Sequence, residues 1–375
     1  MRQVKGMVAA MRRRSGGASG PSAVDPQGLP DAAADKATAA TADGSAGGMV
    51  CRVFHGGHHA ATVVPWTGLR EALAEPQTFV WVDGIDPSPA ELSRLQQAFH
   101  LHPLAVEDIV HAHQRPKIEP YGDGDEGYWF LVVHPATLER DDLRLHEMAV
   151  VTGKRFLITI RQPPAYPLED VERRWRSLPE RLHGESGLLL YTVLDAVVDS
   201  YFPVADHFEE RVDAVEALLF APRPRQEEVL RAIFSMKKDG QRFRRAALPM
   251  REILAPIMRG DLPLFSESQA AYFRDVYDHA VRVIDQVDTT RDLTNSALDV
   301  QLSATANRQS EISKQLTLIA TVFLPLSFIT GFFGQNFALL TSHITSPTAF
   351  WVFGVASQLG VVALLVVFFK RRGWL

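Results

Sequence analysis

A stripe of small and polar residues within an otherwise apolar segment near the C-terminus is the part of this sequence best suited to ion chemistry. Its members recur at alternating steps of four and three residues: Ser313, Thr317, Ala320, Leu324, Ser327 and Gly331. That spacing places them along one side of a helix as a heptad seam. Hydroxyl and carbonyl oxygens on such a seam can accept hydrogen bonds from the water around an ion in a pore. Small residues on a seam also let membrane helices pack closely, and both interpretations stand at this point.

Few other residues suggest chemistry. The single cysteine, Cys51, excludes a disulfide framework or a multi-cysteine zinc site within one chain. His55, His58 and His59 form a small cluster that could bind a metal, but we interpret it as a surface turn. The sequence has no glycine-rich phosphate loop, G-x-S-x-G or H-E-x-x-H motif, so we expect neither enzymatic activity nor a cofactor. A net charge of -5 argues against nucleic acid as a partner.

The stripe lies in the first of two uncharged segments, residues 316–334 and 350–369. Each has about the 20 residues that cross a bilayer. Lys314 precedes the first and Lys370 to Arg372 follow the second, whereas the outer loop 335–349 has no Lys or Arg. The positive-inside rule therefore predicts a multi-pass protein of the cell membrane with both termini in the cytoplasm. Two spans cannot enclose a pore, so transport requires a homo-oligomer in the lipid bilayer.

Two regions precede the spans. Residues 49–186 mix strand signals, at 79–82, 128–133, 147–151 and 155–160, with a helix that starts at a capping box, Ser88-Pro89-Ala90-Glu91. This mixture predicts a sheet covered by helices. Residues 187–315 form a helical stalk, with helices expected over 188–220 and 225–259. Residues 268–323 contain no Gly or Pro and would form one helix about 80 Å long that enters the membrane.

The two ends of the sequence differ from the rest. In residues 1–48, 27 of the 48 positions are Ala, Gly, Ser or Pro and the only leucine is Leu29. Such a segment buries too little apolar surface to fold, so we expect a disordered tail. Residues 370–375 form a short basic tail. The fold class is therefore an α+β membrane protein with an α/β sandwich domain, a helical stalk and two transmembrane helices per chain.

Several segments of the chain resemble the CorA family of divalent-cation channels and transporters. The matching segments lie in family order: 102–109 (HPLAVEDI), 113–117 (HQRPK), 272–279 (YFRDVYDH), 320–326 (ATVFLPL) and 369–375 (FKRRGWL). The resemblance implies a homopentamer whose first span lines the pore. Its Gly-Met-Asn signature, which coordinates the hydrated cation at the outer mouth, corresponds here to Gly334, Gln335 and Asn336. Gln335 departs from the pattern, and the outer loop lacks the acidic residues that family loops often carry.

The resemblance also implies a gate and cytoplasmic sensors. Leu316 and Leu324 match the apolar constriction of the pore. Asp108 on one chain and Asp299 on the next match a regulatory metal site, and a second set matches Glu107, Asp199 and Asp275. The expected function is gated influx of Mg²⁺, or of Co²⁺ or Ni²⁺, with Mg²⁺ as both substrate and regulator. The alternatives are a Zn²⁺ transporter of the ZntB type and a non-conducting, membrane-anchored cation sensor.

Overall fold

The computed structural model describes residues 48–55, 61–123, 127–178, 186–221, 225–259, 267–335, 340, 342 and 346–374. The chain divides into two units, Met1–Ala46 and Gly47–Leu375, and every described residue belongs to the second. The predicted disordered tail therefore lies, except for Gly48, outside the described residues. His58 and His59 lie outside them as well, while Nδ1 of His55 is 3.3 Å from a carboxylate oxygen of Glu75.

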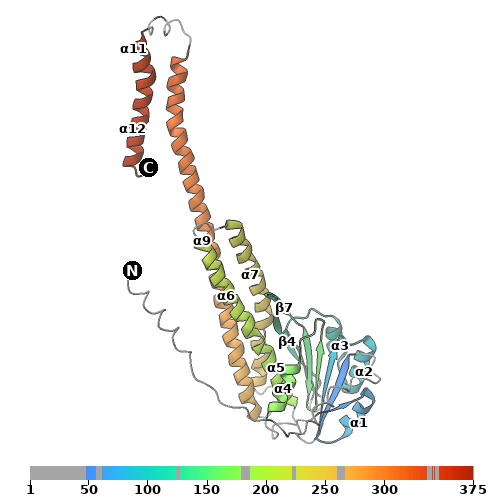
Figure 1. Ribbon diagram of the computed structural model, residues 1–375. Coiled ribbons are helices and arrows are strands. Elements are labelled where there is room, and N and C mark those ends of the chain that lie inside the picture. Colours follow the sequence, from blue (N-terminus) through green and yellow to red (C-terminus); the bar gives the residue numbers. More distant parts are fainter. Residues whose placement is uncertain are drawn as a thin grey trace, which may run out of the picture. The chain divides into compact units, whose positions relative to one another are not determined.

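A seven-stranded sheet of order β2-β1-β3-β9-β8-β5-β4 forms the predicted α/β domain (Figure 1). Its strands are β1 Met49–His55, β2 Ala61–Val64, β3 Thr78–Ile85, β4 Lys117–Tyr121, β5 Tyr128–Val133, β8 Met148–Gly153 and β9 Phe156–Arg161. Only the pair β3–β9 is parallel, and β8–β9 is the predicted hairpin. A separate hairpin, β6 Ala136–Glu139 and β7 Asp142–Leu145, completes the strands.

Both faces of the sheet are covered by helices, because alternate residues of each strand are apolar on opposite sides. On β3, Phe79 and Trp81 enter one apolar core, while Val80 and Val82 enter the other. The second core contains α1 Leu69–Ala74, α2 Pro89–Phe99 and α3 Pro103–Val110. The first contains α4 Glu169–Ser177 and α5 Ser186–Asp199. The prediction of a sheet covered by helices is confirmed.

The helical region continues from α5 through α6 Tyr201–Leu219, α7 Gln226–Ala247 and α8 Met250–Met258. The two long helices expected from the sequence are thus each divided. At the first break, Ser200 Oγ donates to the Val197 carbonyl and accepts from the Ala136 amide, so it ties the helix junction to β6. At the second break stands Pro249, which has no amide hydrogen to continue the helical ladder.

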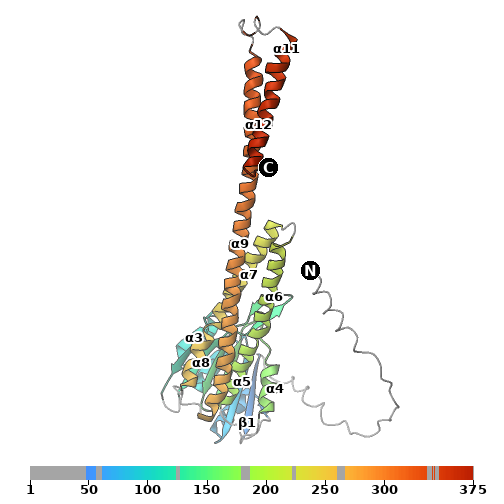
Figure 2. The same cartoon turned by 90° about the vertical axis from the view of Figure 1, so that its left-hand side faces the viewer.

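The long helix predicted over 268–323 extends further, as α9 Glu267–Phe333, a single helix of 67 residues that continues through Pro325. One face of its first part is buried, from Gln269 to Gln301, against α5, α6, α7 and α8. From residue 302 onward its side chains are exposed or half-buried. Figure 2 shows α9 running past α6 and α7 and then alongside the last helix.

The chain reverses direction after α9. It returns as α11 Pro347–Ala349, the π-helical segment η4 Phe350–Ala356 and α12 Ser357–Arg371. Contacts join α12 and η4 to α9, and Gln358 Nε2 donates to Thr330 Oγ1 at 3.0 Å. The polar groups of two otherwise apolar helices are thereby paired with each other. The domain boundaries given above stay predictions.

Among the described residues, three helical stretches are long and apolar enough to cross a membrane: Gly187–Leu219, Gln269–Phe333 and Pro347–Arg371. The most apolar window of the first is 72% buried within the protein, because α5 and α6 supply the core beside the sheet. The corresponding windows of the other two are 0% and 6% buried. Their apolar surfaces therefore face outward.

Candidate functional site

The seam on α9 is left uncovered by the returning helix. All six of its residues are exposed, and Leu316, beside it, is 67% exposed and Leu324, within it, 75%. The half-buried positions of this part of α9 lie on the far side of the helix: Lys314, Leu318, Thr321, Val322, Pro325, Leu326 and Ile329. Because α12 packs against α9 on one side only, the seam is free to face other copies of the chain.

The Thr317 hydroxyl of the seam is partly committed to its own helix. Thr317 Oγ1 donates to the Ser313 carbonyl at 2.9 Å, and on the far side of the helix Thr321 Oγ1 donates to the Thr317 carbonyl at 2.7 Å. The Thr317 hydroxyl oxygen keeps its acceptor lone pairs, which are what the hydrogens of a hydrated cation require. Pro325 removes the amide that would bond the Thr321 carbonyl, so that carbonyl is a further acceptor at this level.

The outer end of α9 shows why a glycine stands at the first signature position. The Gly334 amide donates to the Thr330 carbonyl at 2.9 Å, and a Cβ built on Gly334 would lie 3.1 Å from that oxygen. A larger residue would therefore require the Thr330 carbonyl to shift by a few tenths of an ångström. Gln335 is exposed, and its backbone amide donates a hydrogen bond to the Phe332 carbonyl at 3.3 Å. Asn336 lies outside the described residues, so its role at the pore mouth stays a prediction.

The first predicted regulatory pair stays a prediction as well. Asp108 is half-buried on α3, where Lys117 Nζ lies 2.8 Å from its Oδ2 and 2.9 Å from Glu119 Oε1. Burial acts to lower the pKa of Lys117, but its two carboxylate partners raise it above its ordinary value. Asp299 is exposed on α9, 24 residues beyond Asp275, which is about 36 Å along the helix.

Two members of the second predicted set, Asp199 and Asp275, lie close together where α5 meets α9, at a place that we call the carboxylate corner. Asp199 ends α5, and Asp275 lies on α9; His279 stands between them, with Nδ1 3.8 Å from Asp199 and Nε2 4.0 Å from Asp275. Glu107 is separate within the chain, because α3 packs on the opposite face of the sheet from α5. Only a neighbouring copy could bring a Glu107 to this corner.

Three residues of this corner were missed from the sequence: Asp195, Arg174 and His279. Potential ligand atoms of Asp195, Asp199 and His279 all lie within 4.8 Å of one another. Arg174 of α4 pairs with both carboxylates, with Asp195 and, at 2.7 Å, with Asp199. The i,i+4 spacings of Asp195 with Asp199 and of Asp275 with His279 could have indicated two helix faces that meet here.

The carboxylates of this corner repel each other in a partly buried place. Burial and the charge of Asp199 raise the pKa of Asp195. Burial acts to lower the pKa of Arg174, but its hydrogen bonds and its attraction to Asp199 and Asp195 raise it. The corner therefore requires positive charge, and Arg174 supplies it within the chain.

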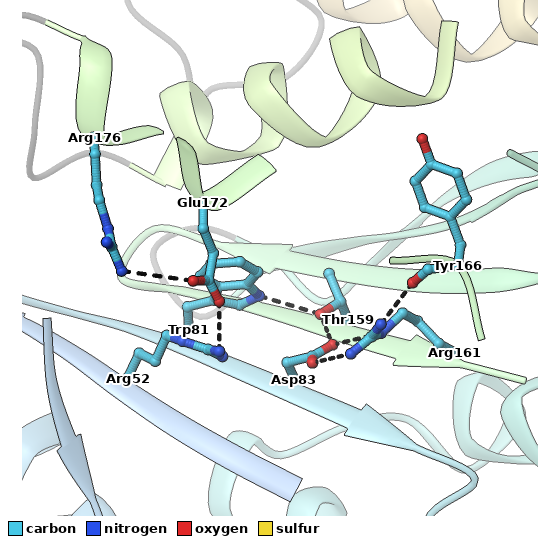
Figure 3. Close-up of polar contacts among 8 residues, drawn as sticks. All are labelled: Arg52, Trp81, Asp83, Thr159, Arg161, Tyr166, Glu172 and Arg176. Carbon is cyan, nitrogen blue, oxygen red and sulfur yellow. Dashed lines mark hydrogen bonds and ion pairs between the residues drawn. The ribbon is translucent and has the colours of Figure 1, made fainter. Parts of the chain in front are cut away.

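A network of paired charges joins α4, the helix that carries Arg174, to the sheet. Figure 3 shows this network. Arg52 of β1 reaches Glu172 of α4 at 2.5 Å, with its guanidinium over the Trp81 ring. Deeper in the network, Asp83 pairs with Arg161 and accepts from Thr159 Oγ1 at 2.7 Å. Each charged side chain of the network thus has a partner of opposite charge, although Nη1 of Arg52 is buried without a hydrogen-bond partner.

Comparisons with known proteins identify the family and the fold of the chain. The family described as "CorA-like Mg2+ transporter protein" matches residues 76–371. The cobalt/magnesium transport protein CorA of Thermotoga maritima is 33% identical over 305 residues, which cover 80% of this chain and 83% of that protein. The complete structure of the CorA magnesium transporter from Methanocaldococcus jannaschii matches with a TM-score of 0.70 and 23% identity, over 87% of this chain and 98% of that one.

The ZntB alternative has weaker support. The cytoplasmic domain of ZntB from Vibrio parahaemolyticus matches with a TM-score of 0.55 and 13% identity, over 70% of this chain and 99% of that one. Such a likeness shows a shared fold alone. The family match, by contrast, runs from the sheet through the stalk and both apolar helices. The chain belongs to the CorA-like Mg²⁺ transporter family.

Proposed function

We propose that copies of this chain assemble, as a homopentamer by family resemblance, into a membrane pore for the gated influx of Mg²⁺, with Co²⁺ as a second cargo. The observation that carries the proposal is the uncovered seam on α9, which α12 leaves exposed along its whole length. Rotation of several copies around one axis would bring these seams together and shield them from lipid. The chain acts as a transporter and not as an enzyme.

The basic residues argue for the orientation. Lys314 precedes the apolar part of α9, and Lys370, Arg371 and Arg372 end the returning helix. With two membrane crossings these residues lie on the same side, and the positive-inside rule makes it the cytoplasm. The sheet domain and the stalk then face the cytoplasm, and the chain turns at the outer surface of the cell membrane.

Leu316 and Leu324 supply the gate in this proposal. Both side chains project from the chain with most of their surface exposed. A ring of leucines around an axis would leave no polar group for a hydrated ion, so the constriction would dewet and block passage. A slight widening of the ring would admit water and ions.

Regulation would act through the carboxylates of the sheet domain and stalk. Mg²⁺ prefers carboxylate and amide oxygens and keeps several of its waters. In the proposed assembly it would join Asp108 to Asp299 of a neighbour, and Asp199 and Asp275 to a neighbour's Glu107. The roughly 36 Å of helix between Asp299 and Asp275 would separate the two sites along α9.

Flux into liposomes tests the function, with two glycines as a matched pair. A Cβ on Gly331 of the seam or on Gly360 of α12 would meet no atom within 4 Å, so leucine fits either helix of the single chain. We expect Gly331→Leu to reduce Mg²⁺ uptake at least about tenfold, because five added side chains would narrow and dewet the pore. Gly360→Leu faces away from the axis and should transport normally.

Other outcomes separate the alternatives. Uptake of Zn²⁺ without Mg²⁺ would support the ZntB-type alternative, for which Gln335 at the middle signature position is the relevant departure. No flux of any divalent cation by the wild-type protein would contradict both transport proposals and leave the non-conducting sensor. Asn336→Ala should abolish Mg²⁺ uptake if the pore mouth coordinates the hydrated ion as the family resemblance implies.

A further inference from the structure

A cavity of about 140 Å³ lies between α6, α7 and α9, and none of its lining residues belongs to the carboxylate corner or to the seam. Its apolar walls are Phe208 of α6, Met236 of α7 and Val287 of α9, all of which are buried. Its polar walls include three basic side chains, Lys237, Arg244 and Arg291.

A glycine keeps the cavity open. Gly240 lines it from the interior of α7, and a Cβ built there would meet no atom within 4 Å. Glycine is unfavourable inside a helix, and the rest of α7 consists largely of residues that favour helix formation. The missing side chain leaves space at the cavity wall that an alanine or leucine would occupy without a backbone clash.

The basic groups are held in place and exceed their acidic partners. Asp288 accepts from Arg244 Nε at 2.6 Å and lies 3.4 Å from Arg291, so one carboxylate orients both guanidinium groups. Arg291 also pairs with Asp292 at 3.0 Å. In the part of the chain that the structure describes, no carboxylate lies within 4.0 Å of Lys237 Nζ. An anion at the mouth of the cavity would therefore meet an unpaired ammonium beside two fixed guanidiniums.

The size and the remaining polar groups restrict what could enter. A cavity of about 150 Å³ holds one benzene molecule, so this cavity has room for about one ring. The hydroxyls of Thr290 and Thr294 donate to carbonyls of their own helix, the Gln286 and Thr290 carbonyls. Because their hydrogens are already donated, these hydroxyl oxygens can only accept hydrogen bonds. They therefore offer no donor to an anionic group in the apolar interior of the cavity.

We propose that this cavity is a binding site for a small organic anion that carries one aromatic ring. The ring would lie against Phe208, Met236 and Val287, and a phosphate or similar group would lie among Lys237, Arg244 and Arg291. Neither half of such a ligand suffices: the cations are partly exposed and bind a bare anion weakly, and a ring alone leaves the three cations without an anion. This site is independent of the proposed transport.

Calorimetry with three probes on the detergent-solubilised full-length protein tests the proposal. We expect phenyl phosphate to bind at least about tenfold more tightly than inorganic phosphate or benzyl alcohol, since only the first satisfies both halves of the site. Equal binding of phenyl phosphate and inorganic phosphate would reduce the site to a surface cluster of cations and overturn the proposal. The absence of phenyl phosphate binding would overturn it too.

Variants locate the binding. Lys237→Gln should weaken phenyl phosphate binding about fivefold, the worth of one partly exposed ion pair. Gly240→Leu should abolish it by filling the cavity. Lys238→Gln removes the neighbouring exposed lysine, which does not line the cavity, and should leave binding unchanged. If Lys237→Gln and Lys238→Gln behave alike, the ligand binds elsewhere, whether or not Gly240→Leu folds normally.

Discussion

At the scale of single residues, each of the two predicted regulatory sites contains a carboxylate that is already paired with a basic side chain of the same chain. Lys117 forms an ion pair with Asp108, and Arg174 forms ion pairs with Asp199 and its neighbour Asp195. A divalent cation that binds either place must displace or bypass that side chain. The apparent affinity for Mg²⁺ is then the difference between two competing cations, one of them tethered at a high local concentration.

Arg174 offers a direct test of this competition. We expect Arg174→Met to lower the free energy of unfolding by about 1 kcal/mol, a modest loss because solvent screens a side chain that is 35% exposed. The uncompensated carboxylates should then bind Mg²⁺ more readily, so Mg²⁺ should raise the melting temperature of the variant more than that of the wild type. Thermal unfolding with and without Mg²⁺ measures both effects.

The adjacent residue provides the control. Arg173 is 76% exposed on the same turn of α4 and pairs only with Asp170 at 2.5 Å among the contacts described. Arg173→Met should change neither the stability nor its response to Mg²⁺. If the two variants respond equally to Mg²⁺, Arg174 is not the internal competitor described here.

A half-buried histidine, His134, makes the stability of the sheet domain depend on pH. Burial lowers the pKa of His134 to about 4, and its Nε2 has no hydrogen-bond partner. In the unfolded chain the same group takes up a proton near pH 6.5. Below that pH the unfolded state binds a proton that the folded state does not, so stability falls as the pH falls from about 6.5 toward 4.

The loss through His134 should be on the order of 2 kcal/mol between pH 8 and pH 5. Unfolding of the wild type and of His134→Asn at both pH values measures it. The variant should lose less stability over this interval, whatever its stability at pH 8. An identical loss in both proteins would show that other groups cause the pH dependence.

At the scale of elements, local signals were readable in the sequence wherever neighbours along the chain decide the structure. The capping box that starts α2 is present. The Ser88 backbone amide donates to Glu91 Oε2 at 2.7 Å, and the Glu91 backbone amide donates to Ser88 Oγ at 3.4 Å. The β8–β9 hairpin and the continuity of α9 depend on similar local patterns. The spacing of residues supplied the seam, whereas the resemblance to the family supplied the gate residues Leu316 and Leu324 and the signature residues.

Pairing between segments that are far apart in the sequence could not be predicted from the sequence. The parallel pair β3–β9 joins residues more than 70 positions apart, and no local pattern specifies such a partner. The edge strand β4 was missed because Pro120 interrupts its short polar sequence, Lys117–Tyr121. The carboxylate corner was predicted incompletely for the same reason, since its members come from three separate helices, α4, α5 and α9.

The cap of α2 yields a prediction on that helix alone. Ser88→Ala should cost about 1 kcal/mol, because it leaves the first-turn amide of Glu91 without its side-chain acceptor. Hydrogen exchange of the α2 amides should accelerate accordingly. Ser93→Ala on the same helix is the control, because exposed Ser93 only donates to the Pro89 carbonyl and alanine is the better helix former there. Equal acceleration in both variants would contradict a specific role of the cap.

At the scale of the whole molecule, the single chain is incomplete. In the proposed function, the exposed seam and leucines and the predicted role of Glu107 all depend on further copies of the chain. Closed rotational symmetry would bring the same residue of each copy to the same height around one axis. A cysteine on the seam should therefore lie near its own equivalent in the next copy, whereas a cysteine on the opposite side of α9 should not.

The native cysteine does not interfere with such an experiment. Cys51 is the only cysteine, it is buried in β1, and burial raises the pKa of its thiol to about 11. A thiol that is buried and protonated at neutral pH reacts slowly with oxidants. Cross-linking of an introduced cysteine can thus be measured in the wild-type background.

Ser313→Cys and Gln315→Cys form the decisive pair. Both positions are exposed on α9 just before its apolar part, and two residues of helix turn them about 160° apart. Under mild oxidation in membranes, Ser313→Cys should form a covalent dimer, because seam residues of neighbouring copies face a common axis. Gln315→Cys should remain monomeric on the same gel. If Gln315→Cys cross-links and Ser313→Cys does not, the other face of α9 lines the axis, and the seam packs against something other than the pore.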